Sequence, residues 1–315
     1  MVTFSRETTG AEVVETWKEY IAGKTVVITG ASAGGLGSQT ALDIAAAKPA
    51  TLVLLARQAS KVQPVIDRIA ELSPSTKVAF VPIFLDDLES VRSAAAEVGR
   101  HVQKIDVLIN NAGIMAVPYS KTEIGVESQF ATNHLGHFVF TQRLFPLIKA
   151  AGKTARVVNL TSNGYLVCPF RADDINFDDG KTYDPLSGYG QSKTANILFT
   201  KGLAKRGVTS FAVHPGVIFE THLGDGLDLS IFGTINEVTE RNTGRKFGQM
   251  DQPKSLEQGS ATTLVAAFDP TIRDASGGYL KDCHLTEVVE HAQDQSSVEK
   301  LWELSESLVG EKFVI

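Results

Sequence analysis

The sequence predicts an α/β domain built on a doubly wound, mainly parallel sheet of about seven strands, with helices on both faces. Short apolar runs alternate with helical patterns, which is typical of parallel strands joined by right-handed crossovers. Each run is apolar throughout, so both faces of the sheet should be covered. The runs lie at residues 24–29, 51–56, 77–81, 105–109, 156–160 and 208–213.

Length, charge and cysteine content limit the classes of function that this protein can have. A chain of 315 residues suits one sizeable core, and we expect a single domain spanning 1–315. With 30 basic and 36 acidic residues, the chain favours a small-molecule partner over nucleic acid. Two cysteines, Cys168 and Cys283, indicate free thiols and a reducing compartment. Because no run of 18 apolar residues occurs, we expect a cytoplasmic protein without a membrane span, and the sequence leaves a homo-oligomer open.

The first strand follows an amphipathic helical pattern at residues 11–20 and ends in the glycine-rich segment 29–37. A helical pattern follows at 38–47. In such a strand–turn–helix unit of a Rossmann-type sheet, glycines let the backbone approach a pyrophosphate at the helix N-terminus. A glycine-rich turn without a ligand is the alternative. The predicted cofactor contacts here are Gly30, Ser32, Gly35, Leu36 and Gly37.

The second strand ends at residues 54–58, Leu-Leu-Ala-Arg-Gln, without an acidic residue. In dinucleotide folds an acidic residue at this point binds the adenosine ribose and repels a 2′-phosphate. Arg57 stands there instead, and its guanidinium can bind a phosphate, with Lys61 one turn further on. This predicts NADP(H) rather than NAD(H). The alternative is an arginine that covers the strand end and leaves both cofactors acceptable.

Polar residues follow the fourth and fifth strands. Asn111, Ala112 and Gly113 allow close approach of a ligand, and Ser162 places a hydroxyl beyond the carboxyl edge of the sheet. Ligands of open α/β sheets bind at that edge. A strand-ending turn and a helix cap are the alternatives.

Tyr189 and Lys193 stand four residues apart in the helical pattern that begins near Ser187, so they share one helical face. A nearby cation should lower the pKa of the phenol and make the pair a tuned acid/base. A packed tyrosine and a solvated lysine are the alternative.

In their order along the chain, these motifs resemble the short-chain dehydrogenase/reductase family over nearly the full length. The pattern comprises the glycine loop, Asn-Asn-Ala-Gly, a helix asparagine at Asn133, Ser162 and Tyr-x-x-x-Lys. Segments 174–177 and 189–196 resemble the branch similar to retinol dehydrogenases and the WW-domain oxidoreductase, most like fungal members of unassigned substrate. The resemblance implies an NADP-dependent alcohol dehydrogenase or carbonyl reductase.

The resemblance also implies roles for individual residues. Tyr189 would exchange a proton with the substrate oxygen, Lys193 would lower the phenol pKa and bind the nicotinamide ribose, and Ser162 would polarise the carbonyl. Asn133 would hold a water that connects Lys193 to solvent. Donors of this kind stabilise charge that develops on the substrate oxygen. Further implied cofactor contacts are Gly216, Ile218 and Thr221.

Two departures from the family pattern stand out. The glycine loop holds one extra residue, so either Gly34 or Gly35 fills the middle position. Phe84 stands where the family usually has the aspartate that binds adenine. Asp86 takes that role only if the register shifts by two residues.

Residues 219–253 are rich in glycine and mix apolar with charged side chains. We expect a loop with short helices that closes as a lid over a largely apolar substrate. Its apolar residues could instead anchor the loop itself.

No metal site is expected. The aspartates of the 173–179 segment are interpreted as solvated, and His134 and His137 as packed or hydrogen-bonded residues. The alternatives to an oxidoreductase are a catalytically silent cofactor-binding redox sensor or scaffold, and an epimerase or dehydratase that uses bound cofactor transiently. Release of oxidised or reduced cofactor would separate an oxidoreductase from both.

Overall fold

The computed structural model describes residues 3–224 and 229–315. Within these ranges the strands form one eight-stranded sheet in the order β3-β2-β1-β4-β5-β6-β7-β8. All neighbours are parallel except β7 and β8. The predicted doubly wound α/β fold is confirmed. The bounds are β1 Thr25–Thr29, β2 Thr51–Ala56, β3 Lys77–Pro82, β4 Val107–Asn110, β5 Arg156–Leu160, β6 Ser210–His214, β7 Tyr279–Lys281 and β8 His284–Thr286.

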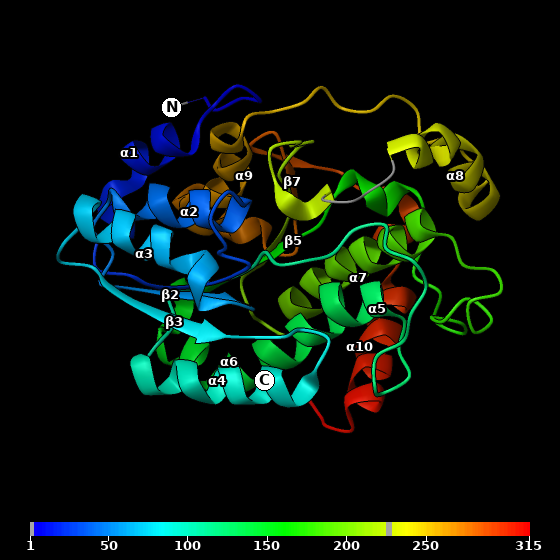
Figure 1. The fold of residues 1–315 in the computed structure, drawn as a ribbon, viewed down its shortest axis with the longest axis horizontal. Helices are drawn as coiled ribbons and strands as arrows, with labels where there is room; N and C mark the ends of the chain where they lie inside the picture. The colour runs from blue at the N-terminus through cyan, green and yellow to red at the C-terminus, as the bar shows by residue number, and fades with distance from the viewer. Residues whose placement is uncertain (1–2, 225–228) are drawn as a thin grey trace.

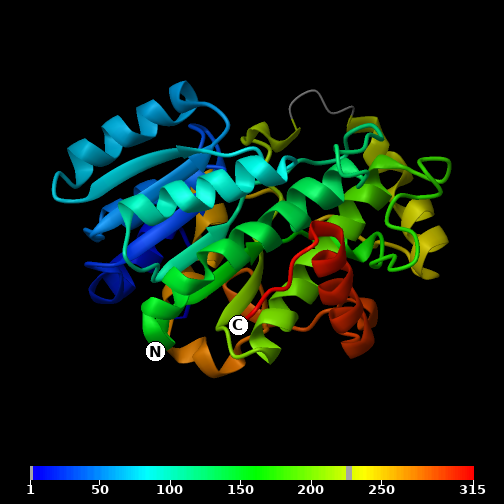
Figure 2. The ribbon, with the colours of Figure 1, turned by 90° about the horizontal axis from the view of Figure 1, so that it is seen from below.

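Helices cover both faces of the sheet, as Figures 1 and 2 show. Alternate residues of β1 define the two sides, because Val27 joins one core cluster while Val26 and Ile28 join the other. The face of Val26 is covered by α1 Gly10–Ile21, α2 Leu36–Ala45, α3 Ala59–Leu72 and α9 Leu256–Phe268. The opposite face is covered by α4 Leu88–His101, α6 Gly136–Ala150, α7 Pro185–Lys205 and α10 Gln295–Val309.

Local sequence signals explain several helix ends. Thr9 caps α1 and forms a capping box with Glu12, and Ser255 caps α9 in the same way with Gln258. Helix α10 ends at Gly310, which has φ 72° and so occupies the left-handed region that glycine adopts readily. None of the helices within the described ranges is long and apolar enough to cross a membrane.

The β7–β8 hairpin is the part of the sheet that the sequence did not predict. Its two-residue turn is Asp282-Cys283, and both residues have positive φ, 52° and 67°. Such turns usually carry Asn-Gly or Asp-Gly, and each flanking strand has only three residues. The sequence therefore contains neither of the dipeptides typical of a hairpin turn nor apolar runs long enough to predict these two strands.

Candidate active site

Helix α7 brings Tyr189 and Lys193 to the carboxyl edge of the sheet. Asp184 caps its N-terminus by accepting a hydrogen bond from the Ser187 N–H, at 2.8 Å. Both site residues are buried, with 7% and 4% of their surface exposed. The Lys193 ammonium lies 5.4 Å from the centroid of the Tyr189 ring and 3.4 Å from the carbonyl oxygen of Leu160, the last residue of β5.

Burial shifts the pKa of Tyr189 upward, opposite to the shift that the sequence predicted. Desolvation raises the pKa of this phenol to about 12, against a hydrogen bond from Ser162 that lowers it. Desolvation also lowers the pKa of Lys193 to about 8. The sequence-based expectation of a lowered phenol pKa is therefore wrong for the protein alone, because both charged forms lose hydration in the same buried region.

Ser162 follows β5 and caps the short helix η3 Asn163–Leu166. Its Oγ accepts a hydrogen bond from the Gly164 N–H, at 3.0 Å. Gly164 in turn lies against the catalytic candidate on α7, since a Cβ at this glycine would come within 2.7 Å of Tyr189 Cε1. The turn that carries Ser162 is thus packed directly on Tyr189.

Asn133 lies in a π-helical turn, η1 Ala131–Leu135, between α5 Ser128–Phe130 and α6. Its amide group donates to the Ile114 carbonyl and to Ser192 Oγ, both at 2.9 Å, and accepts from the Ile114 N–H at 2.8 Å. A Cβ at Gly113 would lie 3.0 Å from Asn133 Oδ1 and 3.5 Å from Lys193 Nζ. Single π turns often mark functional sites, and this one places Asn133 beside Lys193.

His137 connects this π turn to the end of β1, a link that the sequence analysis did not identify. Thr29 Oγ1 accepts hydrogen bonds from the backbone N–H groups of Asn111 and Ala112, which use both of its lone pairs. Its hydroxyl proton therefore points to His137 Nε2, at 2.9 Å. His137 must then carry its proton on Nδ1 and donate it to the Asn133 carbonyl, at 3.1 Å. Burial lowers the pKa of His137 to about 4, which keeps the ring neutral.

The glycine-rich turn fits a dinucleotide. A Cβ at Gly37 would lie 2.5 Å from the Gly30 carbonyl oxygen and 2.6 Å from Asn111 Nδ2, so these residues pack without side chains between them. Gly34 has φ 76° and Gly35 caps α2, so each of the two adjacent glycines has its own backbone role. The first turn of α2 holds no acidic side chain, which suits an anion at this helix N-terminus.

The amide of Asn111 is used inside this turn. It donates to the carbonyls of Thr29 at 2.8 Å and Gly30 at 3.2 Å, and so ties the end of β4 to the end of β1. The side-chain N–H groups of Asn111 therefore have protein partners, and the cofactor contact at Asn111 stays a prediction.

The end of β2 lies beside the glycine turn. The Ala33 N–H donates to the Lys61 carbonyl at 2.8 Å, and Gly30 N–H donates to the Leu55 carbonyl at 2.7 Å. These bonds bring Ser32 close to the first turn of α3. Arg57, between β2 and α3, is exposed.

Phe84 and Asp86 lie in the segment after β3, where the Asp87 N–H donates to the Phe84 carbonyl at 3.2 Å and closes a turn at Leu85-Asp86. Both Phe84 and Asp86 are exposed, whereas Ile83 and Leu85 are buried. Asp87, which the sequence analysis did not single out, caps α4 by accepting from the N–H groups of the first turn.

The loop after β6 is closely packed. Gly216 has φ 101°, and a Cβ there would lie 2.7 Å from Lys254 Cδ. Ile218 packs on the core cluster beneath α9, and Thr221 Oγ1 lies 3.5 Å from the Ile218 carbonyl. Residues 219–253 hold η4 His222–Gly224, η5 Leu229–Thr234 and α8 Ile235–Thr243. Residues 225–228, which include Gly226 and Leu227 of the predicted lid, lie outside the described residues.

The other polar candidates have protein partners. His134 is buried and its Nε2 lies 2.9 Å from Ser305 Oγ, which confirms the packed interpretation. Asp174 pairs with Arg171, and Asp179 pairs with Lys121. Cys168 and Cys283 are both free and buried.

Comparison with known proteins agrees with this fold. The family model described as short chain dehydrogenase matches residues 24–170. Retinol dehydrogenase 12 of Mus musculus is 36% identical over 299 residues, covering 92% of this chain and 87% of the relative. Retinol dehydrogenase 14 of Homo sapiens is 35% identical over 308 residues, covering 91% and 87%.

Among solved structures, an uncharacterised protein from Mycobacterium paratuberculosis superposes with a TM-score of 0.69 at 30% identity, covering 94% of this chain and 96% of that one. An NADPH-bound carbonyl reductase from chicken fatty liver shares the fold, with a TM-score of 0.59 at 20% identity and coverage of 85% and 95%. The chain belongs to the short-chain dehydrogenase family. It is thus an oxidoreductase that acts on a small molecule.

Proposed function

We propose that this protein is an NADP(H)-dependent oxidoreductase that interconverts a carbonyl and an alcohol by hydride transfer. The observation that carries the proposal is the grouping of Tyr189, Lys193 and Ser162 at the carboxyl edge of the sheet, with Asn133 next to Lys193. Retinol dehydrogenases at about 35% identity over most of the chain support alcohol or carbonyl chemistry.

The residues of the site have complementary parts in this reaction. The nicotinamide, when bound, supplies or accepts the hydride. Tyr189 with its raised pKa holds the proton that the substrate oxygen needs when a carbonyl is reduced, and Ser162 supplies a second donor to the same oxygen. Lys193, with a pKa near 8, can relay protons to Tyr189 and bind the ribose.

Asn133 belongs to this relay through its main chain. Both N–H bonds of its amide donate to protein acceptors and its Oδ1 accepts from the Ile114 N–H, so we assign the water that connects Lys193 to solvent to the Asn133 carbonyl. His137 orients that carbonyl by donating its Nδ1 proton to it, at 3.1 Å.

The glycine turn, Arg57 and the loop 214–221 would hold the cofactor. The choice of NADP(H) rests on Arg57, which is exposed beside the glycine turn at the end of a strand without an acidic residue. A guanidinium there can pair with a 2′-phosphate, and Lys61 lies on the adjoining turn of α3.

An apolar substrate agrees with the exposed side chains of the 219–253 segment. Phe219 is 63% exposed, Leu223 39% and Met250 41%, and such side chains gain free energy when they are covered. We assign this segment the role of a substrate-binding lid. Retinol, which appears in the names of two of the relatives, is a candidate substrate of this apolar class.

The proposed function is tested by assaying the protein with a panel of carbonyls and NADPH, alongside Tyr189→Phe. The substitution removes the proton donor and leaves the ring packing intact, so kcat should fall by about 10²–10⁴-fold while NADPH binding persists. Turnover of the variant within a few-fold of the parent would contradict the acid/base role of Tyr189.

The same assay separates the rival functions. A redox sensor or scaffold would bind NADPH without oxidising it, and an epimerase or dehydratase would convert substrate without net change in cofactor. Accumulation of NADP⁺ in proportion to the alcohol formed supports the oxidoreductase.

A further inference from the structure

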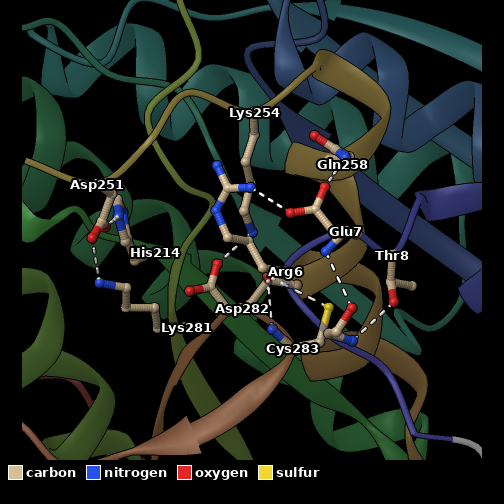
Figure 3. A network of polar contacts seen from close by, with 12 residues as sticks. Arg6, Glu7, Thr8, His214, Asp251, Lys254, Gln258, Lys281, Asp282 and Cys283 are labelled. Atoms are coloured by element: carbon tan, nitrogen blue, oxygen red, sulfur yellow. Dashed lines mark hydrogen bonds and ion pairs between the residues drawn. The ribbon is translucent and has the colours of Figure 1, made fainter.

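The segment 251–254, where the 219–253 segment rejoins the body of the protein, is held from both sides. Arg6 donates to the carbonyls of Gln252 at 2.8 Å and Pro253 at 2.7 Å. On the other side, Pro253 forms a β-bridge with Val217, and the Lys254 N–H donates to the Val217 carbonyl at 2.8 Å. Figure 3 shows the N-terminal residues Arg6 and Glu7 beside Lys254 and Gln258.

Asp251 opens this segment and accepts hydrogen bonds from side chains on three parts of the described chain. Lys281 on β7 donates to Oδ1 at 2.7 Å, His214 at the end of β6 lies 3.1 Å from Oδ2, and Asn163 donates to Oδ2 at 2.6 Å. Figure 3 shows Asp251 between His214 and Lys281. Hydrogen bonds to a carboxylate are stronger than those between neutral groups.

The charges of this cluster balance. His214 Nε2 faces a carboxylate, which only accepts, so that nitrogen carries the ring proton. Burial lowers the pKa of His214, while the hydrogen bonds from His214 and Lys281 hold the pKa of Asp251 below its usual range. The cluster therefore joins a carboxylate, a neutral imidazole and an ammonium.

Asn163 links this cluster to the active site. It follows Ser162 directly and begins η3, and its Oδ1 accepts a hydrogen bond from the Tyr279 hydroxyl at 3.1 Å. The Ser162 hydroxyl caps the same short helix through Gly164, which packs on Tyr189. A shift of Asn163 would therefore move Ser162 Oγ relative to the Tyr189 ring.

We propose that Asp251 is a positioning residue of the active site. Its carboxylate fixes Asn163 and thereby the Ser162 hydroxyl, and it makes this geometry depend on the end of the 219–253 segment. The inference rests on the proposed function, because that function gives the Ser162 hydroxyl its role at the substrate oxygen.

The first test replaces the carboxylate by its amide in Asp251→Asn. Loss of charge-assisted hydrogen bonds should lower kcat by about 10- to 100-fold with a carbonyl and NADPH, because Ser162 is no longer fixed. The dissociation constant of NADPH should stay unchanged. Asp179→Asn is the matched control, since the Asp179 carboxylate, like that of Asp251, accepts a hydrogen bond from a lysine side chain but lies in the 173–179 segment. The control should keep the parental kcat.

A second variant separates positioning from general destabilisation. The double variant carries both Asn163→Asp and Asp251→Asn, so the amide and the carboxylate exchange positions. A hydrogen bond from an amide to a carboxylate is thereby retained between the two positions. The double variant should recover part of the kcat lost in Asp251→Asn. Parental kcat in the single variant, or no recovery in the double variant, would overturn the proposal.

Crystal structures of the parent protein and of Asp251→Asn give a readout that does not depend on turnover. A displaced η3 or a rotated Ser162 side chain supports the positioning role, and an unchanged η3 overturns it. A parent protein that converts no carbonyl or alcohol with either cofactor would contradict the proposed function instead, and the two structures would still decide the role of Asp251.

Discussion

At the scale of single residues, burial sets the protonation states of the site. Tyr189 and Lys193 both lose hydration, so desolvation holds the phenol protonated and makes the ammonium easier to deprotonate. A protonated phenol is the form that can donate to a substrate oxygen. His137 follows the same rule, and its neutral ring can orient the Asn133 carbonyl without adding charge beside Lys193.

Arg57 differs from these residues because it is exposed, so its charge has little influence on folding and can serve a ligand. Arg57→Asp should lower kcat/KM for NADPH by about 10- to 100-fold and reduce the ratio of NADPH to NADH activity, because a phosphate contact is replaced by repulsion. Steady-state kinetics with both cofactors measure this ratio. Arg68→Asp, on the exposed surface of α3, is the control and should leave the ratio unchanged. A parent protein that prefers NADH would refute the assignment of NADP(H).

At the scale of elements, the glycine turn owes its shape to close backbone packing. The Gly37 Cα faces the Gly30 carbonyl and the Asn111 amide, which leaves no space for a methyl group. Helix α2 can therefore start directly against the ends of β1 and β4. This closeness places the helix N-terminus at the carboxyl edge of the sheet.

Gly37→Ala should destabilise the protein by about 1–3 kcal/mol and weaken cofactor binding, because the added Cβ meets rigid backbone. Gly99→Ala is the matched helical control. Its Cβ would meet only Leu147 Cδ1, at 4.0 Å, so the higher helix propensity of alanine should stabilise the protein by about 0.5–1 kcal/mol. Urea denaturation measures both changes, and equal stability of the two variants would contradict the packing argument.

At the scale of the whole molecule, the C-terminal residues complete the core on one face of the sheet. Figure 2 shows α10 and the C-terminus, in red, beside α6 and α7. The Trp302 ring stacks on Phe313 at 5.1 Å and meets Phe138 edge-on at 5.3 Å, and the Arg206 guanidinium lies 3.9 Å from the Trp302 ring centroid. Residues more than a hundred positions apart in sequence thus form one aromatic cluster.

Trp302→Ala should destabilise the protein by about 3–5 kcal/mol, because it leaves a cavity among buried aromatic rings. Val314→Ala, at a side chain next to Phe313 that is 81% exposed, should change the free energy of unfolding by less than about 0.5 kcal/mol. Guanidinium denaturation of both variants compares the two values. A loss for Trp302→Ala as small as that for Val314→Ala would show that the C-terminal cluster contributes little.

The sequence by itself determined the parallel sheet, because apolar runs of strand length and the helical patterns between them are local signals. The bounds of β2 and β5 agree with the predicted runs, while β6 starts two residues later and ends one residue later than predicted. The motif residues around Tyr189 and Ser162 could also be located in advance, since the carboxyl ends of parallel strands meet at one edge.

Only the tertiary structure decided which groups are desolvated and which side chains meet across the fold. The raised pKa of Tyr189 depends on burial that no spacing of Tyr and Lys reveals. The contacts of Asp251 with Asn163, His214 and Lys281 join segments that are 30 to 88 residues apart, so no local pattern indicates them. Local sequence signals select elements, whereas hydration and long-range contacts depend on how those elements pack.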